Sequence, residues 1–327
     1  MSDESIYIYE NENIIWALPG LFQYEAVLGT FQDYCKMLGF KPFNVDFYGA
    51  PATVWNGGRK PVIYDKLTPK EISKVFEYVK SNNATPVLTF NNTEITNESL
   101  DDEYANLILD IALEYNAKFM VYSDLLRDYI KNKKQDAIVI ASVIKPVVYF
   151  QGQDRIDEPT IEKESEFYNK LLKEYDIVAL RAEYSKFALV NNTSLIDDIS
   201  RVQVLINQTC LQNCAYAVEH IKFNEKFNTS QELNYDFICP KKTLSANIRY
   251  MNNAAHTQKE IQTLIDAGVR NLKLKGRGGS CEPMLLLRIF QTLLCRTDGA
   301  NYHVITSYPE AHMDMETDYF AKFIGRS

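Results

Sequence analysis

The sequence lacks the features that would direct a chain into or across a membrane. Its first residues, Met1-Ser-Asp-Glu-Ser5, contain no basic segment followed by a long apolar one, so no signal peptide is visible. No apolar run approaches the roughly 18–20 residues of a membrane span. We therefore expect a cytoplasmic protein that makes no membrane contact. Six cysteines in a reducing compartment then indicate metal ligation, redox chemistry or burial, and not disulfides.

An excess of positive charge is also missing. The formal net charge of -8 argues against broad, sequence-independent binding of nucleic acid, although a local basic patch remains compatible with it. No linker-like or low-complexity segment interrupts the chain, and a hydrophobic content of 46% is enough for a full core. A length of 327 residues fits one large barrel or two ordinary domains.

Short apolar segments alternate with helical patterns almost to the end of the chain. The expected strands are 14–18, 43–48, 85–90, 118–122, 137–143, 177–180, 202–206 and 269–274. The expected helices are 23–38, 69–79, 98–115, 124–131, 161–174, 258–267 and 283–294. Eight strands separated by helices predict a (β/α)8 TIM-like barrel. A doubly wound open sheet is the alternative, but no GxGxxG motif follows the first strand.

We accordingly expect residues 1–327 to form a single barrel domain, with a C-terminal tail outside the barrel. Residues 221–257 form the longest stretch without clear alternation. They predict an insertion between the seventh and eighth strands, and a long insertion at a barrel mouth is usually functional.

Four cysteines stand at predicted strand ends or in loops. Cys210 and Cys214 follow the seventh strand, Cys239 lies in the insertion, and Cys281 follows the eighth strand. Four converging thiolates can hold a four-iron cluster or a zinc ion. The competing interpretation is that the cysteines are small buried apolar residues. If Cys239 lies elsewhere, His220 is the natural fourth ligand and zinc is favoured.

Two phrases in this region resemble the collagenase-like peptidase family, which includes oxygen-independent hydroxylases of ubiquinone precursors and RNA. One is Asn207-x-x-Cys210-x3-Cys214, and the other runs from Ala267-Gly-Val to Lys273-Leu-Lys275-Gly-Arg277. Lys275 stands where the family usually has Glu, so the chain is similar to a divergent member. The resemblance implies a barrel and a cluster held by four cysteines. It also implies hydroxylation or a proteolytic activity, and members that work in pairs.

Further candidates follow the strands. Arg277 lies beside glycines after the eighth strand and can clamp a carboxylate or phosphate. Asn207 follows the seventh strand, and Glu183 follows the sixth as a possible general acid or base; a salt bridge with a lysine is an equal alternative for Glu183. Lys273 and Lys275 share one face of a strand, which favours an anionic ligand or internal ion pairs. Trp55 and Arg59 lie in a glycine-containing loop that suits substrate binding.

These observations leave three functional classes. The first is a redox enzyme, such as an oxygen-independent hydroxylase, with an iron–sulfur cluster and a small or polymer-bound anionic substrate. The second is a peptidase-like hydrolase or lyase that uses zinc or a carboxylate, with structural cysteines. The third is a non-catalytic subunit of a homo- or heterodimer.

Overall fold

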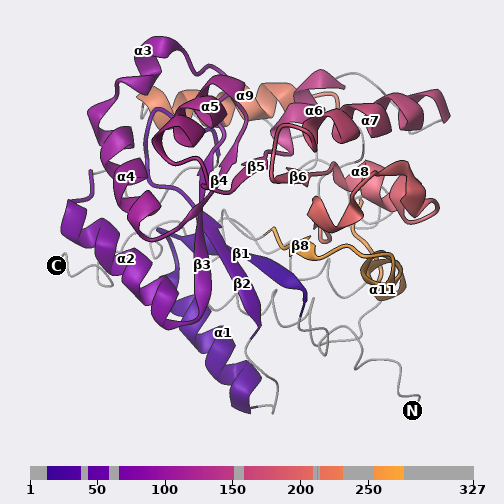
Figure 1. The fold of residues 1–327 in the computed structure, drawn as a ribbon, viewed down its shortest axis with the longest axis horizontal. Coiled ribbons are helices and arrows are strands. Elements are labelled where there is room, and N and C mark those ends of the chain that lie inside the picture. Colours follow the sequence, from indigo (N-terminus) through magenta and orange to yellow (C-terminus); the bar gives the residue numbers. More distant parts are fainter. Residues whose placement is uncertain are drawn as a thin grey trace.

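Eight parallel strands close into a barrel in the computed structural model, in the order in which they occur in the sequence (Figure 1). The structure describes residues 13–37, 43–58, 66–150, 158–208, 212, 214–230 and 254–275. The strands are β1 (Ile15–Leu21), β2 (Asn44–Gly49), β3 (Ala84–Phe90), β4 (Lys118–Val121), β5 (Val139–Ala141), β6 (Ile177–Ala179), β7 (Val202–Leu205) and β8 (Asn271–Lys273). Strand β8 pairs with both β7 and β1, so it closes the ring. The predicted (β/α)8 barrel is confirmed, and the open sheet is wrong.

Helices follow most strands and form the outer layer. They are α1 (Glu25–Met37), α2 (Pro69–Ser81), α3 (Asn97–Leu100), α4 (Glu103–Glu114), α5 (Asp124–Lys133), α6 (Ile144–Tyr149), α7 (Glu158–Leu171), α8 (Ala182–Tyr184), α9 (Ala217–Ser230) and α11 (Gln258–Asp266). A single π-helical turn, Ser185–Leu189, continues from α8. No helix in the described part of the chain is long and apolar enough to cross a membrane.

Side chains along each strand point alternately toward the helices and into the barrel, so they form two separate cores. Because successive strand residues point to opposite faces, Trp16, Leu18 and Phe47 pack outward against the helices. Ala17, Tyr48, Val87, Met120 and Ile140 form a separate cluster inside the barrel. The lumen is therefore a packed core and not a pore.

The barrel interior also holds a buried ion pair. Lys118 Nζ lies 2.8 Å from both carboxylate oxygens of Asp46, and both side chains are almost fully buried. Burial raises the pKa of the Asp46 carboxyl, and the charge of Lys118 opposes that rise. Lys118 is the first residue of β4, so the pair lies toward the base of the barrel, away from the carboxyl ends of the strands.

Local signals account for several helix boundaries. Thr68 and Glu71 form a capping box at the start of α2, and the predicted apolar positions of that helix are its buried residues. The single long helix expected over 98–115 is wrong, because two helices, α3 and α4, occupy that range. The Asp102 side chain accepts a hydrogen bond from the backbone N–H of Ala105 at 2.7 Å, which starts a new helix at that point.

The predicted insertion is partly regular. Residues 217–230 form α9, so the first ten residues of the predicted insertion, 221–230, are helical. The helix predicted over 283–294 and the C-terminal tail lie outside the described residues.

Candidate functional site

The carboxyl ends of all eight strands meet at one end of the barrel, which we call the mouth. Parallel strands in a closed ring place the residue after each strand on this face, where (β/α)8 barrels carry their active sites. The predicted candidates Glu183 and Asn207 follow β6 and β7, and Lys275 follows β8. The structure therefore brings these three positions to the same end of the barrel. Arg277 lies outside the described residues.

Two lysines of the β8 segment enter this end of the lumen. Lys273 Nζ lies 4.2 Å from the centre of the Tyr48 ring and 3.2 Å from the sulfur of Met120, both of which are lumen residues. The Tyr48 hydroxyl donates to the carbonyl of Leu274 at 2.6 Å, which fixes the ring beside β8. Lys275 Nζ contacts Gln208 Oε1 at 3.0 Å. The lysine face predicted from the sequence thus lies in the barrel interior and mouth.

The Asn207 side chain joins the ends of β7 and β8. Its Nδ2 donates to the carbonyl of Lys275 at 3.0 Å, and its Oδ1 accepts from the Lys275 backbone N–H at 2.6 Å. Asn207 is 3% exposed. A buried amide that bonds both backbone groups of the neighbouring strand end extends the sheet, so this geometry gives Asn207 a positioning role toward Lys275.

Helix α9 brings a buried carboxylate to the opposite side of the mouth. Glu225 is 3% exposed. Its two oxygens accept from the backbone N–H and the hydroxyl of Thr93, each at 2.8 Å, just beyond β3. Burial raises the pKa of Glu225, and the two Thr93 hydrogen bonds oppose that rise. Burial and the Glu225 charge also raise the pKa of Tyr122, which follows β4.

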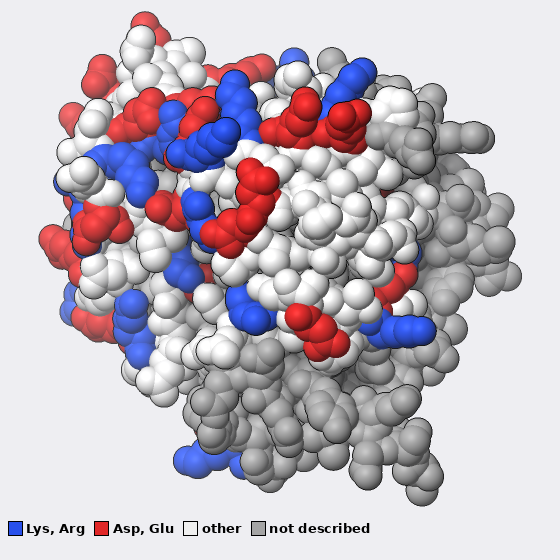
Figure 2. Space-filling model, turned by 45° about the vertical axis from the view of Figure 1, so that its right-hand side comes forward, with Lys and Arg blue, Asp and Glu red and all other residues white. Residues whose placement is uncertain are grey.

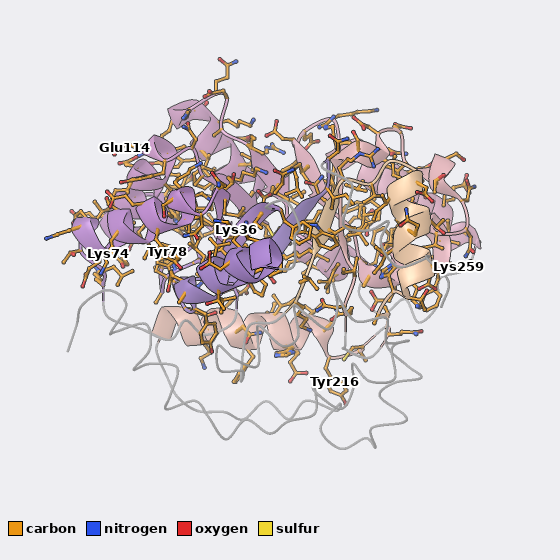
Figure 3. The ribbon with its side chains drawn as sticks, turned by 90° about the horizontal axis from the view of Figure 1, so that it is seen from below. Lys36, Lys74, Tyr78, Glu114, Tyr216 and Lys259 are labelled. Carbon is orange, nitrogen blue, oxygen red and sulfur yellow. The ribbon has the colours of Figure 1, made fainter. Side chains whose placement is uncertain are left out.

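The path of α9 explains how a residue after β7 reaches β3. The helix packs against α6, which follows β5, and runs across the picture behind α5 and α6 in Figure 1. In Figure 3 it forms a separate layer along one side of the molecule, with Tyr216 before its first turn. The sequence did not point to Glu225. The residue pattern of a helix does not show which distant loop an acidic side chain on it will contact.

Glu183 stands beside a fully paired cluster at the end of β6. Arg181 binds both carboxylate oxygens of the buried Glu164, at 2.8 and 2.6 Å, and Tyr168 donates to the same carboxylate at 2.6 Å. This cluster ties α7 to the end of β6. Glu183 itself is half-buried and forms no hydrogen bond with a described residue, so its carboxylate remains a candidate acid or base.

A histidine also approaches the rim between β6 and β7. His256 Nε2 lies 3.1 Å from Ser185 Oγ, and its backbone N–H donates to the carbonyl of Ile206 at 2.8 Å. Ser185 Oγ also lies 3.0 Å from the Ala182 carbonyl, which can accept a hydrogen bond from the hydroxyl. Burial and the nearby Lys186 charge lower the pKa of His256 to about 4. The ring is therefore neutral at physiological pH.

Trp55 is enclosed in the structure. Its side chain is 0% exposed, packs edge-on against Phe90 and Tyr129, and donates its indole N–H to the Ser99 carbonyl at 2.7 Å. Trp55 therefore supports its loop from within the outer core, and the substrate contact predicted for it stays a prediction. An aromatic residue next to glycines looks the same in the sequence whether it binds a substrate or supports a loop from inside. Arg59 lies outside the described residues.

Of the four predicted metal ligands, Cys214 alone belongs to the described part of the chain. It is half-buried in the turn that leads from β7 into α9. Cys210, Cys239 and Cys281 lie outside that part, and their predicted convergence stays a prediction. Within the described ranges, no three His, Cys, Asp or Glu side chains gather as a metal site. His220 lies half-buried on α9.

Among known proteins, we find a likeness to solved structures but not to curated sequences. No family model and no curated protein matches the chain. Among solved structures, the chain is similar to that of the U32 peptidase Mk0906, with a TM-score of 0.48 and 12% sequence identity. The match covers 81% of this chain and 93% of the other.

Proposed function

We propose that this chain is a barrel enzyme that binds an anionic substrate at its mouth and modifies it by redox chemistry at an iron–sulfur cluster. The position of Lys273 and Lys275 is the observation that supports an anionic substrate. Lys273 lies in the lumen beside Tyr48 and Met120, and Lys275 lies at the mouth beside Gln208. Deeper in the lumen, Asp46 is paired with Lys118. Lysine ammonium groups at the mouth favour a substrate that carries a carboxylate or a phosphate, and the carboxyl groups of Glu183 and Glu225 lie at the same end of the barrel.

The cluster rests on the cysteines. Strands β7 and β8 are neighbours, so residues that follow them start from adjacent points of the mouth. Cys214 is half-buried there, which suits a thiolate ligand shielded from water but open to a metal. We propose Cys210, Cys214, Cys239 and Cys281 as the ligands of a four-iron cluster. When bound, the cluster would supply one-electron transfer from the substrate toward an external electron acceptor, since hydroxylation with oxygen from water removes two electrons from the substrate.

The resemblance of the sequence phrases to collagenase-like peptidases supports oxygen-independent hydroxylation as the form of the reaction. In this proposal Lys275 and Arg277 hold the anionic group, with Arg59 near them. Glu183 and Glu225 are the carboxyl groups that can move a proton at the mouth. Asn207 holds the Lys275 backbone in place.

Anaerobic purification followed by iron and acid-labile sulfide analysis tests the cluster. We expect about four irons and four sulfides per chain and broad absorbance near 400 nm, both lost in Cys214→Ser. Cys35→Ser, on α1, is the matched control and should keep both. One zinc without sulfide would instead favour the second candidate, a peptidase-like hydrolase or lyase with a Cys3His site that includes His220. A folded protein that contains no metal would favour the third functional class, a non-catalytic subunit.

Anion binding is tested separately with citrate and pyrophosphate as probes. We expect either anion to raise the thermal midpoint of the wild-type chain and to have no effect on Lys275→Ala, because a ligand that binds only the folded state stabilises it. Lys259→Ala, on exposed α11 (labelled in Figure 3), is the control and should respond like the wild type. Equal midpoint shifts in all three proteins would contradict a lysine site at the mouth.

A further inference from the structure

A groove lies outside the barrel, between α7 and the segment that follows β6. It encloses about 500 Å³. Its floor is mainly apolar and includes Ile161, Ala188 and Leu195. Ala188 belongs to the π-helical turn, and short π-helical segments are frequent at functional sites. None of the lining residues belongs to the mouth, so the groove is a second, separate feature of the molecule.

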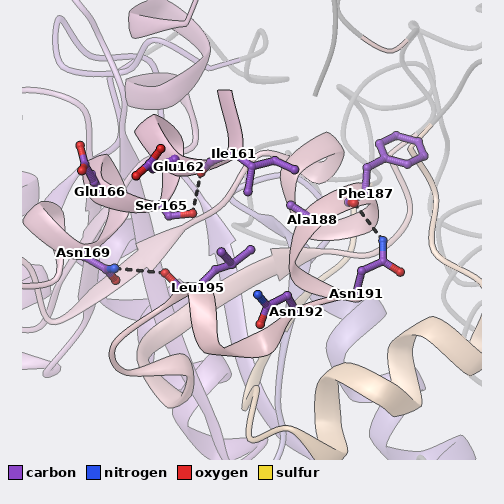
Figure 4. A pocket seen from close by; sticks show the side chains of 10 residues that line it. All are labelled: Ile161, Glu162, Ser165, Glu166, Asn169, Phe187, Ala188, Asn191, Asn192 and Leu195. Carbon is purple, nitrogen blue, oxygen red and sulfur yellow. Dashed lines mark hydrogen bonds between the residues drawn. The ribbon is translucent and has the colours of Figure 1, made fainter. Parts of the chain in front are cut away.

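Two exposed glutamates stand on one rim. Glu162 and Glu166 are exposed and one helical turn apart on α7, and their carboxylates lie on the same side of the groove in Figure 4. Neither forms a hydrogen bond or an ion pair with another residue in the part of the chain that the structure describes. By contrast, Glu164 on the buried face of the same helix binds Arg181. Like charges at this spacing destabilise a helix, so a cation placed between them would relieve the repulsion.

The opposite rim is apolar. Phe187 lies across the groove from the glutamates in Figure 4 and is 37% exposed, one of the few large hydrophobic residues of the described chain with such exposure. Figure 2 turns this side forward and shows a broad area without charged side chains, bordered by both acidic and basic ones. The surface therefore combines an apolar trough with negative charge along one edge.

We propose that this groove binds a peptide segment of a partner protein in which an apolar side chain stands next to a lysine or an arginine. The apolar side chain would lie on Ile161, Ala188 and Leu195 beside the Phe187 ring. The cation would lie between Glu162 and Glu166, where its charge complements that of the two carboxylates. An apolar peptide with acidic flanks is rejected by the same rim, which gives the site its selectivity.

The site would also be coupled to the barrel. Glu164 lies on the buried face of α7 and binds Arg181, which directly follows β6. Ser165 lines the groove and also hydrogen-bonds with the Tyr184 hydroxyl in the segment after β6. An occupant that shifts α7 would therefore move the segment that carries Glu183. The docking inference itself does not depend on the function proposed for the mouth.

Fluorescence anisotropy with two defined probes tests the proposal. One probe is a fluorescein-labelled helical peptide of about 14 residues made of leucine and lysine, and the other replaces every lysine by glutamate. We expect the wild-type chain to bind the lysine peptide at least about tenfold more tightly than the glutamate peptide. The double variant Glu162→Lys/Glu166→Lys should reverse that preference, and Phe187→Ala should weaken binding of the lysine peptide about fivefold or more.

A matched control separates the groove from the general negative charge of the protein. Glu114→Lys/Asp136→Lys makes the same change in net charge at exposed positions far from the groove (Glu114 is labelled in Figure 3). It should keep the wild-type preference. The proposal is overturned if this control loses the preference as fully as Glu162→Lys/Glu166→Lys does, or if the wild type does not distinguish the two peptides. Circular dichroism of each variant confirms folding before binding is measured.

Discussion

At the scale of single residues, the ion pair inside the barrel is the clearest source of a large mutational effect. Lys118→Met leaves the buried Asp46 carboxylate without its partner, and we expect a loss of about 3–5 kcal/mol in the free energy of unfolding. The double variant Asp46→Leu/Lys118→Met removes both charges and should recover most of that loss. Urea unfolding of the three proteins measures both values. A double variant as unstable as Lys118→Met would show that the loss comes from packing and not from charge.

His256 makes stability depend on pH. Its pKa is about 4 in the folded chain and about 6.5 in an unfolded one, so the unfolded state binds more protons between these values. Stability should be complete above pH 6.5 and fall as the pH drops toward 4, by up to about 3 kcal/mol. His256→Gln keeps a hydrogen-bonding group for Ser185 but does not titrate. Urea unfolding from pH 7 to 4 should therefore show a steeper loss in the wild type than in this variant. If the stability of the two proteins fell equally with pH, the lowered pKa of His256 would be contradicted.

At the scale of elements, the contact between Glu225 and Thr93 holds α9 over the mouth. Thr93→Val removes the hydroxyl donor while keeping the shape of the side chain, and it leaves one buried carboxylate oxygen without that bond. We expect a loss of about 1–3 kcal/mol and faster amide hydrogen exchange over residues 217–230. Thr193→Val, a half-buried threonine away from the mouth, is the control. Unchanged exchange in α9 would mean that other contacts hold the helix.

The elements themselves were largely predictable, because their signals are local. The Thr68–Glu71 capping box and the apolar spacing of α2 need no knowledge of the fold, and Ser123 caps α5 as expected. The break between α3 and α4 was missed because the apolar stripe of 98–115 continues across it, whereas the cap at Asp102 is decided by one side-chain hydrogen bond. Helix α9 was missed because its apolar face is weakly marked and meets loops far away in sequence.

At the scale of the whole molecule, the strand rhythm predicted the barrel and therefore which residues share the mouth. It could not predict what each side chain touches there. Asn207 and Trp55 carry the same sequence signal as ligand-binding residues, yet one joins two strand ends and the other is enclosed by Phe90 and Tyr129. Side-chain roles of this kind depend on contacts between segments some 40–70 residues apart.

Closure of the ring by β8 predicts that the barrel unfolds as one unit. Both tryptophans of the chain, Trp16 and Trp55, lie near β1 and β2, whereas Asn207 secures the β7–β8 end of the ring. Because β8 also pairs with β1, Asn207→Ala should lower the urea midpoint reported by tryptophan fluorescence as much as the midpoint reported by circular dichroism. The loss should be about 1–3 kcal/mol, since the buried backbone groups of Lys275 lose their partner. A fluorescence midpoint that stays at the wild-type value while the dichroism midpoint falls would show that the two sides of the barrel unfold independently.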